Sequence, residues 1–322
     1  MRSALRQLAV ALALFWVVLT LTFLLIRAAP GDPVSFLAPP AASATELARL
    51  RTSLALDAPL AVQYGRWARE IFKGDLGTSF VAHRPVTRVL GEAIPVSVAL
   101  GGISLVLTFV LGVFVGGVQG ARRGSKLDSA LTLATTTVYA APSFWLALTL
   151  IALFTYGAAR LGVPMWLRLP AFGVRDPAGS TGFAELVRHA VLPVLTLTLI
   201  GGAGIARYAR SSVVELLQLQ WVRTAVAKGV PARAVHARHV LANALPTLLI
   251  LFALALPGVL AGSVFVETVF GWPGVGRLMV SSIFARDYPV VVGATVVYAA
   301  MVILANLAAD LALPLVDPRQ RR

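Results

Sequence analysis

Six long stretches of this sequence contain no Asp, Glu, Lys or Arg, and each is about long enough to cross a membrane as a helix. Counted from one charge to the next, they cover residues 7–26, 93–121, 129–159, 189–206, 239–266 and 288–309. Roughly 20 apolar helical residues span a hydrocarbon core, and each charge placed inside it costs a few kcal/mol on insertion scales. The pattern therefore predicts a polytopic membrane protein.

The composition supports this interpretation and indicates helices as the spanning elements. Hydrophobic residues make up 58% of the chain and charged residues 13%, whereas a soluble domain carries about 25% charged residues. Backbone groups in lipid need internal hydrogen bonds, so a span is a helix or part of a closed barrel. Barrel strands alternate apolar and polar residues, but Leu146–Phe154 is apolar on all sides. We expect an all-α membrane protein with six transmembrane helices and an external insertion after the first.

The positions of Lys and Arg predict that both termini are cytoplasmic. With the N-terminus inside, segments 1–6, 122–128, 207–238 and 310–322 hold 14 basic residues. The outer segments also hold 14, but eight of them lie in the long 27–92 stretch, where the positive-inside rule has little force. The first apolar stretch could instead be a signal peptide, but it exceeds the roughly 7–15 residues of a signal core, so we expect it to be retained.

These features predict three regions: a first transmembrane helix at 1–29, an external insertion at 30–92, and a five-helix core at 93–322 with a cytoplasmic loop at about 207–238. In the insertion, Asp57-Ala-Pro59 is a good helix start. The residues after it predict one apolar face, formed by Leu60, Tyr64, Trp67 and Ile71. The opposite side carries Gln63, Arg66, Arg69 and Glu70. Such a helix could lie on the rim of the bundle or form a docking surface for an external partner.

Glycine and proline punctuate the predicted spans. Gly112/Gly116 and Gly258/Gly262 have the spacing that lets two membrane helices approach closely. This spacing is compatible with packing inside one subunit and with a subunit interface or moving gate. Kinks or weak points are expected at four prolines, which are Pro142, Pro193, Pro246 and Pro257.

The sequence lacks the motifs of an enzyme or a resident cofactor. It has no Gly-x4-Gly-Lys-Ser/Thr for nucleotide phosphates, no Gly-x-Ser-x-Gly elbow and no cysteine. His236 and His239 are spaced for a metal, but Arg233 and Arg238 flank them, so we expect no metal site there. Asp310, near the end of the sixth stretch, is interpreted as a structural acid rather than a proton relay. The net charge of +14 is explained by cytoplasmic loops, and no nucleic-acid partner is expected.

The predicted cytoplasmic loop has a distinctive centre, Trp221–Ala234. The run up to Lys228 favours a helix, Gly229 suits a helix C-terminus that needs a positive φ, and Pro231 suits the first turn of the next helix. The result should be a helix, a tight turn and a second helix, with a basic rim on the inner face. A short rigid protrusion of this kind can be gripped by another protein and can transmit movement to neighbouring spans. A plain amphipathic connector is the alternative.

Several short stretches match the pattern of one protein family, and their order and spacing together make the match very specific. They are Pro30–Pro33, Leu56–Leu60 with Gln63-Tyr64, Gly74–Gly77 with Ser79, Val222–Gly229, Arg238-His239 with Asn243-Ala-Leu, Phe270–Arg277, Arg286–Pro289 and Asp317–Arg319. Through them nearly the whole chain resembles the membrane-spanning subunits of ATP-binding-cassette (ABC) importers of the dipeptide, oligopeptide and nickel permease type. Two positions depart from the wider pattern. The loop begins Arg223-Thr224-Ala225 instead of Glu-Ala-Ala, as is usual in the peptide branch, and Leu313 replaces a common Tyr.

The resemblance implies an importer half-channel in a bacterial inner membrane. The subunit would pair with a homologous, non-identical membrane subunit, and an external binding protein would deliver di- or oligopeptides. Two ATPase subunits would hydrolyse ATP, so the chain itself would not be an enzyme. The residues expected to couple to the ATPase are Arg223, Thr224, Ala225, Lys228, Gly229, Val230 and Pro231.

Three alternatives stay open at this point. Relatives of this kind also import nickel chelates and other small solutes, and the residues that contact substrate are not assigned. A secondary transporter would normally show an inverted repeat and coupling carboxylates. A membrane-embedded enzyme would need a catalytic cluster that the sequence lacks.

Overall fold

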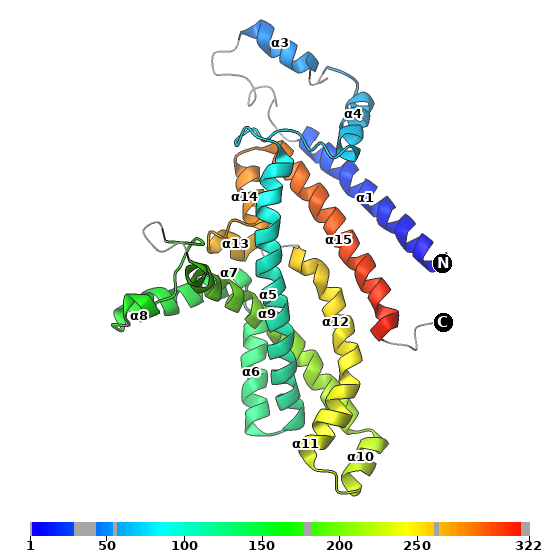
Figure 1. Cartoon of the computed structure of the whole chain (residues 1–322), viewed down its shortest axis with the longest axis vertical. Helices are drawn as coiled ribbons and strands as arrows, with labels where there is room; N and C mark the ends of the chain where they lie inside the picture. The colour runs from blue at the N-terminus through cyan, green and yellow to red at the C-terminus, as the bar shows by residue number, and fades with distance from the viewer. Residues whose placement is uncertain (1, 29–42, 54–56, 177–181, 261–263, 317–322) are drawn as a thin grey trace. The chain divides into compact units, whose positions relative to one another are not determined.

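The computed structural model describes residues 2–28, 43–53, 57–176, 182–260 and 264–316, and within them the chain is almost entirely helical (Figure 1). The first part contains α1 (Arg2–Ala28), α3 (Ala44–Ser53), α4 (Leu60–Phe72), α5 (Val86–Ala121), α6 (Lys126–Ala140), α7 (Ser143–Ile151), the π-helical turn η1 (Ala152–Gly157), α8 (Ala158–Arg160) and the 3-10 turn η2 (Met165–Leu167). The second part contains α9 (Phe183–Leu217), α10 (Gln220–Ala227), α11 (Ala232–Ala234), the π-helical turn η3 (Val235–Leu241), α12 (Ala242–Leu260), α13 (Val264–Val269), α14 (Val275–Phe284) and α15 (Tyr288–Val316).

Five stretches are long and apolar enough to cross a membrane by length and composition. They are Val86–Ala121, Ser143–Arg160, Phe183–Leu217, Arg238–Leu256 and Tyr288–Leu307. A shorter apolar run, Ala9–Leu25, lies within α1. Each of the six charge-free stretches coincides with helix over most of its described length, which confirms the all-α membrane fold.

The third charge-free stretch differs from its prediction, because residues 129–159 do not form one span. Helix α6 ends at Ala140, and α7 begins at Ser143 after the extended residue Ala141 (φ −73°, ψ 134°). The cause is Pro142, since a proline ring disfavours helical conformation in the residue before it. Only the second half, Ser143–Arg160, meets the criterion for a membrane span.

Several features predicted from the sequence fall wholly or partly outside what the structure describes. They are Pro30–Pro33, Leu56, Gly262, the side chains of Arg233, Pro257, Asp310 and Leu313, and the stretch Asp317–Arg319. The three predicted regions of the chain stay predictions.

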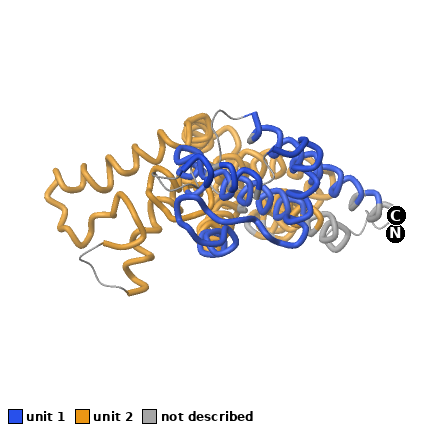
Figure 2. Tube along the Cα trace, turned by 90° about the horizontal axis from the view of Figure 1, so that it is seen from above, with its two compact units in different colours: residues 1–94, 278–303 blue, residues 95–277, 304–322 orange. Residues whose placement is uncertain are grey.

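The chain forms two compact units, which Figure 2 distinguishes by colour. Unit 1 comprises residues 1–94 and 278–303, and unit 2 comprises residues 95–277 and 304–322. The division falls inside α5, α14 and α15, so the same helices contribute to both units.

In unit 1, α4 packs against α1 through aromatic side chains. The Tyr64 hydroxyl lies 2.7 Å from the Thr20 hydroxyl in a hydrogen bond, and its ring meets Phe23 edge-on at 5.3 Å between centroids. Trp67 contacts the same Phe23 ring at 5.3 Å, and Ile71 is buried in a cluster with Leu19. The predicted apolar face is therefore the one that α4 uses inside this subunit.

Two residues of α4 depart from the predicted pattern. Leu60 is exposed. Gln63, predicted on the polar face, is buried, and its Nε2 donates to the Ala58 carbonyl at 2.7 Å. The side chain thus pairs with a carbonyl just before the helix, a local polar contact that periodicity alone does not anticipate.

Asp287 joins two of the short stretches that characterise the sequence. Its carboxylate accepts hydrogen bonds from the Ser79 hydroxyl at 2.5 Å and from the backbone N–H groups of Phe80 and Val81 at 3.0 and 3.3 Å. Asp287 is only 2% exposed. The stretches around Gly74–Ser79 and Arg286–Pro289, over 200 residues apart, are thus two sides of one buried contact.

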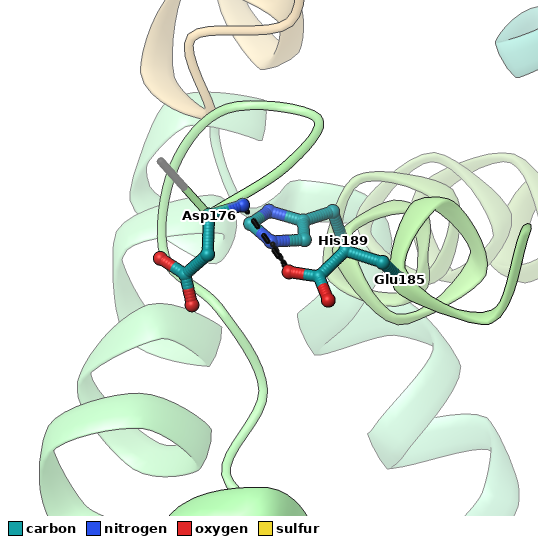
Figure 3. A group of neighbouring side chains, drawn as sticks. All are labelled: Asp176, Glu185 and His189. Carbon is teal, nitrogen blue, oxygen red and sulfur yellow. Dashed lines mark hydrogen bonds and ion pairs between the residues drawn. The ribbon is translucent and has the colours of Figure 1, made fainter. Parts of the chain in front are cut away.

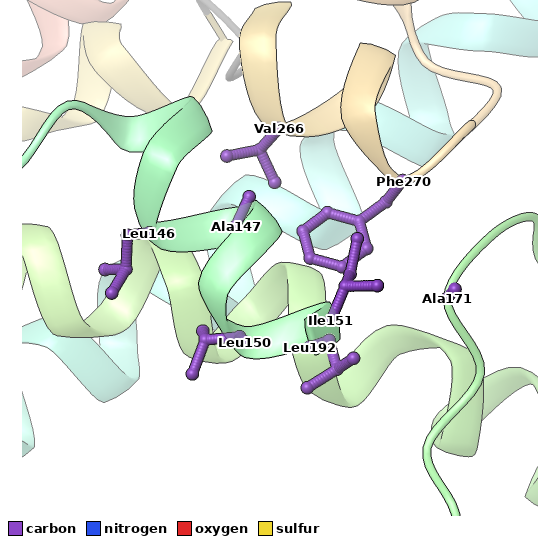
Figure 4. Close-up of a cluster of buried hydrophobic side chains, with 8 residues drawn as sticks. All are labelled: Leu146, Ala147, Leu150, Ile151, Ala171, Leu192, Val266 and Phe270. Atoms are coloured by element: carbon purple, nitrogen blue, oxygen red, sulfur yellow. The ribbon is translucent and has the colours of Figure 1, made fainter. Parts of the chain in front are cut away.

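In unit 2, an apolar core joins α7, α9 and α13 (Figure 4). Ala147, Leu192 and Val266 are completely buried in it, and Phe270 is 1% exposed. Ala147 and Val266 are more than a hundred residues apart in the sequence. This core therefore holds the long helix α9 against α7, which precedes it, and α13, which follows it.

Helices α5 and α9 approach closely along a row of glycines. A Cβ placed on Gly112 would lie 2.7 Å from the Ile205 Cβ, one on Gly120 would lie 2.6 Å from Val213 Cγ1, and one on Gly116 would overlap the Ala206 carbonyl. No larger residue fits without movement of α9. The Gly112/Gly116 pair therefore serves packing inside one subunit, whereas a Cβ on Gly258 would meet nothing within 4 Å.

Candidate coupling site

The predicted helix–turn–helix is present and lies in unit 2. Helix α10 ends at Ala227, and Gly229 follows with φ +79°. The Gly229 N–H donates to the Val226 carbonyl at 2.9 Å, and the Val230 N–H donates to the Ala225 carbonyl at 3.2 Å. This pair of bonds is the Schellman arrangement, which needs a residue with positive φ at this position.

The chain then turns at Pro231 into the next helix. Pro231 has φ −56° and ψ 138° and stands immediately before α11. Its carbonyl accepts from the N–H groups of Ala234 and Val235 at 2.8 and 3.0 Å. Pro231 is thus the residue that caps α11 instead of lying in its first turn as predicted, a difference of one position.

The turn has a small apolar core of its own, which we call the valine core. It consists of Val213, Val222, Val235 and Val240, all at most 3% exposed, and Leu216, Leu217 and Val230 pack against it. The four valines come from α9, α10 and η3, the last of which leads directly into α12. The turn is therefore fixed to two long helices, and a displacement of α10 has to move their ends.

Five of the seven predicted coupling residues are exposed, and the other two are half-buried. Arg223, Thr224, Lys228, Gly229 and Pro231 are exposed, and Ala225 and Val230 are half-buried. Their coupling role stays a prediction.

Two apolar residues on the same protrusion were missed by sequence reasoning. Trp221 and Val226 are 41% and 58% exposed, although both lie on a helix with a buried face. A Trp beside cations is a typical anchor of a protein–protein contact. The available signal was a large aromatic residue next to an exposed basic one at the start of the turn.

Of the two histidines after the turn, the His236 ring has a backbone partner. His236 Nδ1 is bonded to the Ala232 carbonyl at 2.7 Å, and both histidines belong to η3. Within the described residues, neither belongs to a group of ligands that could hold a metal.

A cavity of about 510 Å³, lined mainly by polar side chains, opens beside the C-terminal half of α9 in unit 2. Its lining includes Gln119, Tyr139, Arg207 and Arg210, together with several hydroxyl groups of α6. The Arg207 guanidinium lies over the Tyr139 ring, 5.0 Å from its centroid. A cavity of this size and polarity can hold a small polar molecule.

Glu267 forms a second polar centre that sequence reasoning did not single out. The side chain is fully buried. One carboxylate oxygen accepts from the Ser97 hydroxyl at 2.7 Å, and the other accepts from the N–H groups of Gly276 and Arg277 at 2.8 and 3.2 Å. The Ser97 Oγ also accepts from the Val275 N–H at 2.8 Å. Two distant side chains therefore cap the first turn of α14 and hold the stretch Phe270–Arg277 in place.

The sequence matches known proteins over nearly its whole length. Residues 91–322 match the family described as binding-protein-dependent transport system inner membrane component, and residues 1–101 match its N-terminal part. The chain is 35% identical to the oligopeptide transport system permease protein AppB of Bacillus subtilis strain 168, over 93% of this chain and 92% of that one. It is 34% identical to the "Probable peptide ABC transporter permease protein y4tP" of Sinorhizobium fredii strain NBRC 101917 / NGR234, over 98% of both chains.

The fold also matches a solved structure. A chain in the crystal structure of an amino acid ABC transporter with histidines superimposes with a TM-score of 0.50 at 13% identity, covering 72% of this chain and 94% of that one. This likeness concerns the fold alone. Taken with the family match over most of the sequence, it leads to one assignment: the chain belongs to the family of binding-protein-dependent transport system inner membrane components.

Proposed function

We propose that this chain is the permease subunit of an ATP-driven importer and forms half of its translocation channel together with a homologous membrane subunit. The observation that carries the proposal is the exposed turn at residues 220–231, fixed by the valine core to two membrane helices. A rigid protrusion joined to spans is what a soluble motor needs in order to move them.

The energy for uphill transport has to come from partners, because the chain has no phosphate-binding motif. Two ATPase subunits are proposed to supply it, one of them gripping this turn. The exposed apolar residues Trp221 and Val226, beside the cations Arg223 and Lys228, suit a partner groove with an apolar floor and an acidic rim.

The proposed cargo is a di- or oligopeptide delivered by an external binding protein. The relatives named above as oligopeptide and peptide permeases support this choice, since they align over more than nine-tenths of the chain. The polar cavity beside α9 supplies hydroxyl, amide and guanidinium groups of the kind that pair with peptide groups. Import of a nickel chelate or another small solute is the alternative, and a panel of ligands for the binding protein separates the two.

The proposed orientation places residues 207–238 inside the cell and the 30–92 insertion outside. The chain contains no cysteine, so single cysteines at Lys228 and Arg66, both exposed, can be labelled selectively in intact cells. An impermeant maleimide should label Arg66→Cys in intact cells and Lys228→Cys only after the membrane is opened. The reverse pattern would overturn the orientation.

Reconstitution tests the function itself. Vesicles that contain both permease subunits, both ATPase subunits and the binding protein should accumulate peptide when ATP is present on the ATPase side. Omission of any one component should abolish accumulation. Uphill uptake by this chain alone would contradict the proposal.

A further inference from the structure

Three potential metal ligands lie close together where the chain enters α9, with the Asp176 carboxylate pointing away from the other two groups (Figure 3). Glu185 and His189 lie one helical turn apart on α9, and Asp176 approaches from the preceding segment. One ligand atom from each lies within 4.8 Å of the other two. Among the described residues this is the one group of acids and histidines with that property.

His189 is held in the tautomer that a metal ligand requires. Its Nδ1 lies 3.1 Å from the carbonyl oxygens of Phe172 and Gly173. A carbonyl only accepts, so Nδ1 carries the hydrogen, and in the neutral ring the lone pair is on Nε2. Metal-binding histidines usually donate their other ring N–H to a carbonyl or carboxylate in this way.

The Nε2 atom of His189 is buried and has no hydrogen-bond partner, although the residue is only 3% exposed. Its near neighbour is Glu185 Oε1 at 3.4 Å, without the geometry of a hydrogen bond. Two ligand atoms each about 2.1 Å from a tetrahedral ion lie about 3.4 Å apart. The spacing of these two atoms therefore fits an edge of a coordination tetrahedron.

The Asp176 carboxylate can complete the set by a side-chain rotation, because Asp176 is exposed. Its backbone is already placed, since the Asp176 N–H donates to Glu185 Oε1 at 3.2 Å. The chain before it is fixed as well. The Gly173 N–H donates to the Phe270 carbonyl at 2.8 Å, and Arg188 donates to the carbonyls of Met165 and Arg168 at 2.6 and 2.5 Å. The Arg188 guanidinium is thus engaged by carbonyl groups.

We propose that Asp176, Glu185 and His189 bind a divalent transition-metal ion, with Zn²⁺ as the ion that best suits one imidazole and two carboxylates. Three protein ligands leave a fourth position for water. The bound ion joins the segment before α9 to the first two turns of that helix. An imidazole ligand favours Zn²⁺ over Mg²⁺ and Ca²⁺, which prefer sites built from oxygen alone.

The test is calorimetric titration of Zn²⁺ into the untagged full-length chain in lipid nanodiscs. We expect one saturable site per chain, unaffected by millimolar Mg²⁺. Asp176→Asn, Glu185→Gln and His189→Ala should each weaken Zn²⁺ binding by at least about tenfold. Loss of a residue that only hydrogen-bonds to a metal ligand already weakens affinity about 10- to 100-fold, and loss of the ligand itself should cost at least as much. Asp176→Asn is informative even if a buried variant misfolds, since Asp176 is exposed.

His236→Ala is the matched control. The Nε2 of His236 is also buried without a hydrogen-bond partner, and its Nδ1 also contacts a carbonyl, that of Ala232. It lacks the two carboxylates, so its replacement should leave Zn²⁺ affinity unchanged. As a second measurement, Zn²⁺ should raise the melting temperature of the wild-type chain by mass action, and not that of Asp176→Asn.

Two results would overturn the proposal. The first is the absence of saturable Zn²⁺ binding by the wild-type chain. The second is equal binding by wild-type, Asp176→Asn and His189→Ala chains, which would leave the cluster as a contact between Glu185 and His189 only. Neither readout depends on transport, so failure here is distinct from failure of the proposed function.

Discussion

Asp128 and Glu267 are both buried acids of unit 2, yet their surroundings are opposite in kind. Asp128 is 3% exposed and Glu267 is fully buried. Asp128 faces the guanidinium of Arg210, with Nε to Oδ1 at 2.8 Å and Nη2 to Oδ2 at 2.9 Å. The side-chain and backbone partners of Glu267 are one hydroxyl and two backbone N–H groups. The first acid is paired with a cation, and the second caps the start of a helix.

This difference sets the protonation behaviour of each acid. The hydrogen bonds from Arg210 hold the pKa of the Asp128 carboxyl well below its usual range, with help from the Gly124 N–H and against the effect of burial. Burial raises the pKa of Glu267, and the hydrogen bonds from Ser97, Arg277 and Gly276 offset this only in part. A buried acid that is paired with a cation favours its charged form. A buried acid that accepts hydrogen bonds only from neutral groups loses hydration that those bonds do not fully replace, so its neutral form is favoured.

The two sites also need glycine for different reasons. At Asp128, Gly124 donates its N–H at 3.0 Å with φ +79°, and a Cβ there would meet open space. At Glu267, a Cβ on Gly274 would lie 2.5 Å from the carboxylate and closer still to Ser97 Oγ. One glycine supplies a backbone conformation, and the other supplies room for a carboxylate.

Removal of the charge on Asp128 is expected to have the largest effect on stability. Asp128→Asn leaves Arg210 without its anion, a change that costs about 3–5 kcal/mol at a buried pair. We expect the lower end, about 3 kcal/mol, because the Arg210 side chain is 33% exposed and can turn towards water. Thermal unfolding in detergent measures the loss. A negligible change would mean that the pair contributes no more than a surface ion pair.

Loss of space at Glu267 should come next. Gly274→Ala forces a methyl group against the carboxylate, and overpacking of this kind costs about 1–3 kcal/mol. Gly65→Ala is the matched control, because Gly65 is in α4 with nothing within 4 Å of a Cβ and should gain up to about 1 kcal/mol. Equal effects of the two substitutions on the melting temperature would show that Glu267 can move away at little cost.

A smaller effect is expected at Gly124. Gly124→Ala meets no atom, so its cost is the left-handed backbone conformation alone, about 1–2 kcal/mol. Gly124→Asn should recover part of the loss, because Asn tolerates this conformation better than Ala does. If Ala and Asn proved equally harmless, the backbone at Gly124 would not be constrained as described.

The smallest effect is the pH dependence, and it should have opposite signs at the two acids. The folded-state pKa of Glu267 is raised, so its contribution to stability is present below its unfolded value, near 4.5, and is lost as pH rises above that value. The pKa of Asp128 is lowered, so its contribution is present above about 3.8 and is lost as pH falls below that.

Thermal unfolding measured at a series of pH values from 4.5 upwards separates the two acids, because a carboxyl with a raised pKa releases its proton above its unfolded value of 4.5. Glu267→Gln should flatten the stability profile there relative to wild type, and Asp128→Asn should shift it without changing its slope. Parallel profiles for Glu267→Gln and wild type would mean that Glu267 does not titrate differently on folding.

The sequence was sufficient for the features that depend on local chemistry. Charge-free stretches located the helices, Gly229 and Pro231 located the turn, and the spacing of Gly112 and Gly116 located a close helix contact. Each rests on neighbours along the chain or on the cost of charge in lipid.

The features that sequence reasoning missed depend on residues brought together by the fold. Nothing near Glu267 in sequence identifies Ser97 as its partner, and nothing near Asp287 identifies Ser79. The break at Ala141 was predicted only as a kink or weak point at Pro142, because charge counting alone does not register a proline inside an apolar stretch. Asp176 was missed because its partners lie on a different element, α9.

The most direct test of the account is whether the turn at residues 220–231 transmits ATP-driven movement. In the reconstituted five-component importer, Gly229→Val places a β-branched residue at φ +79°, a conformation that such residues rarely adopt. Lys228→Glu reverses a charge on the same turn, and the free energy of unfolding should change little because Lys228 is exposed. Gly117→Ala, at a helical site with open space, is the control.

Both turn variants are expected to assemble with the other subunits but to import at least about tenfold less peptide per ATP hydrolysed. This corresponds to a coupling loss of about 1.4 kcal/mol or more. The control variant should import peptide normally. Normal coupling in both turn variants would contradict this role of the turn.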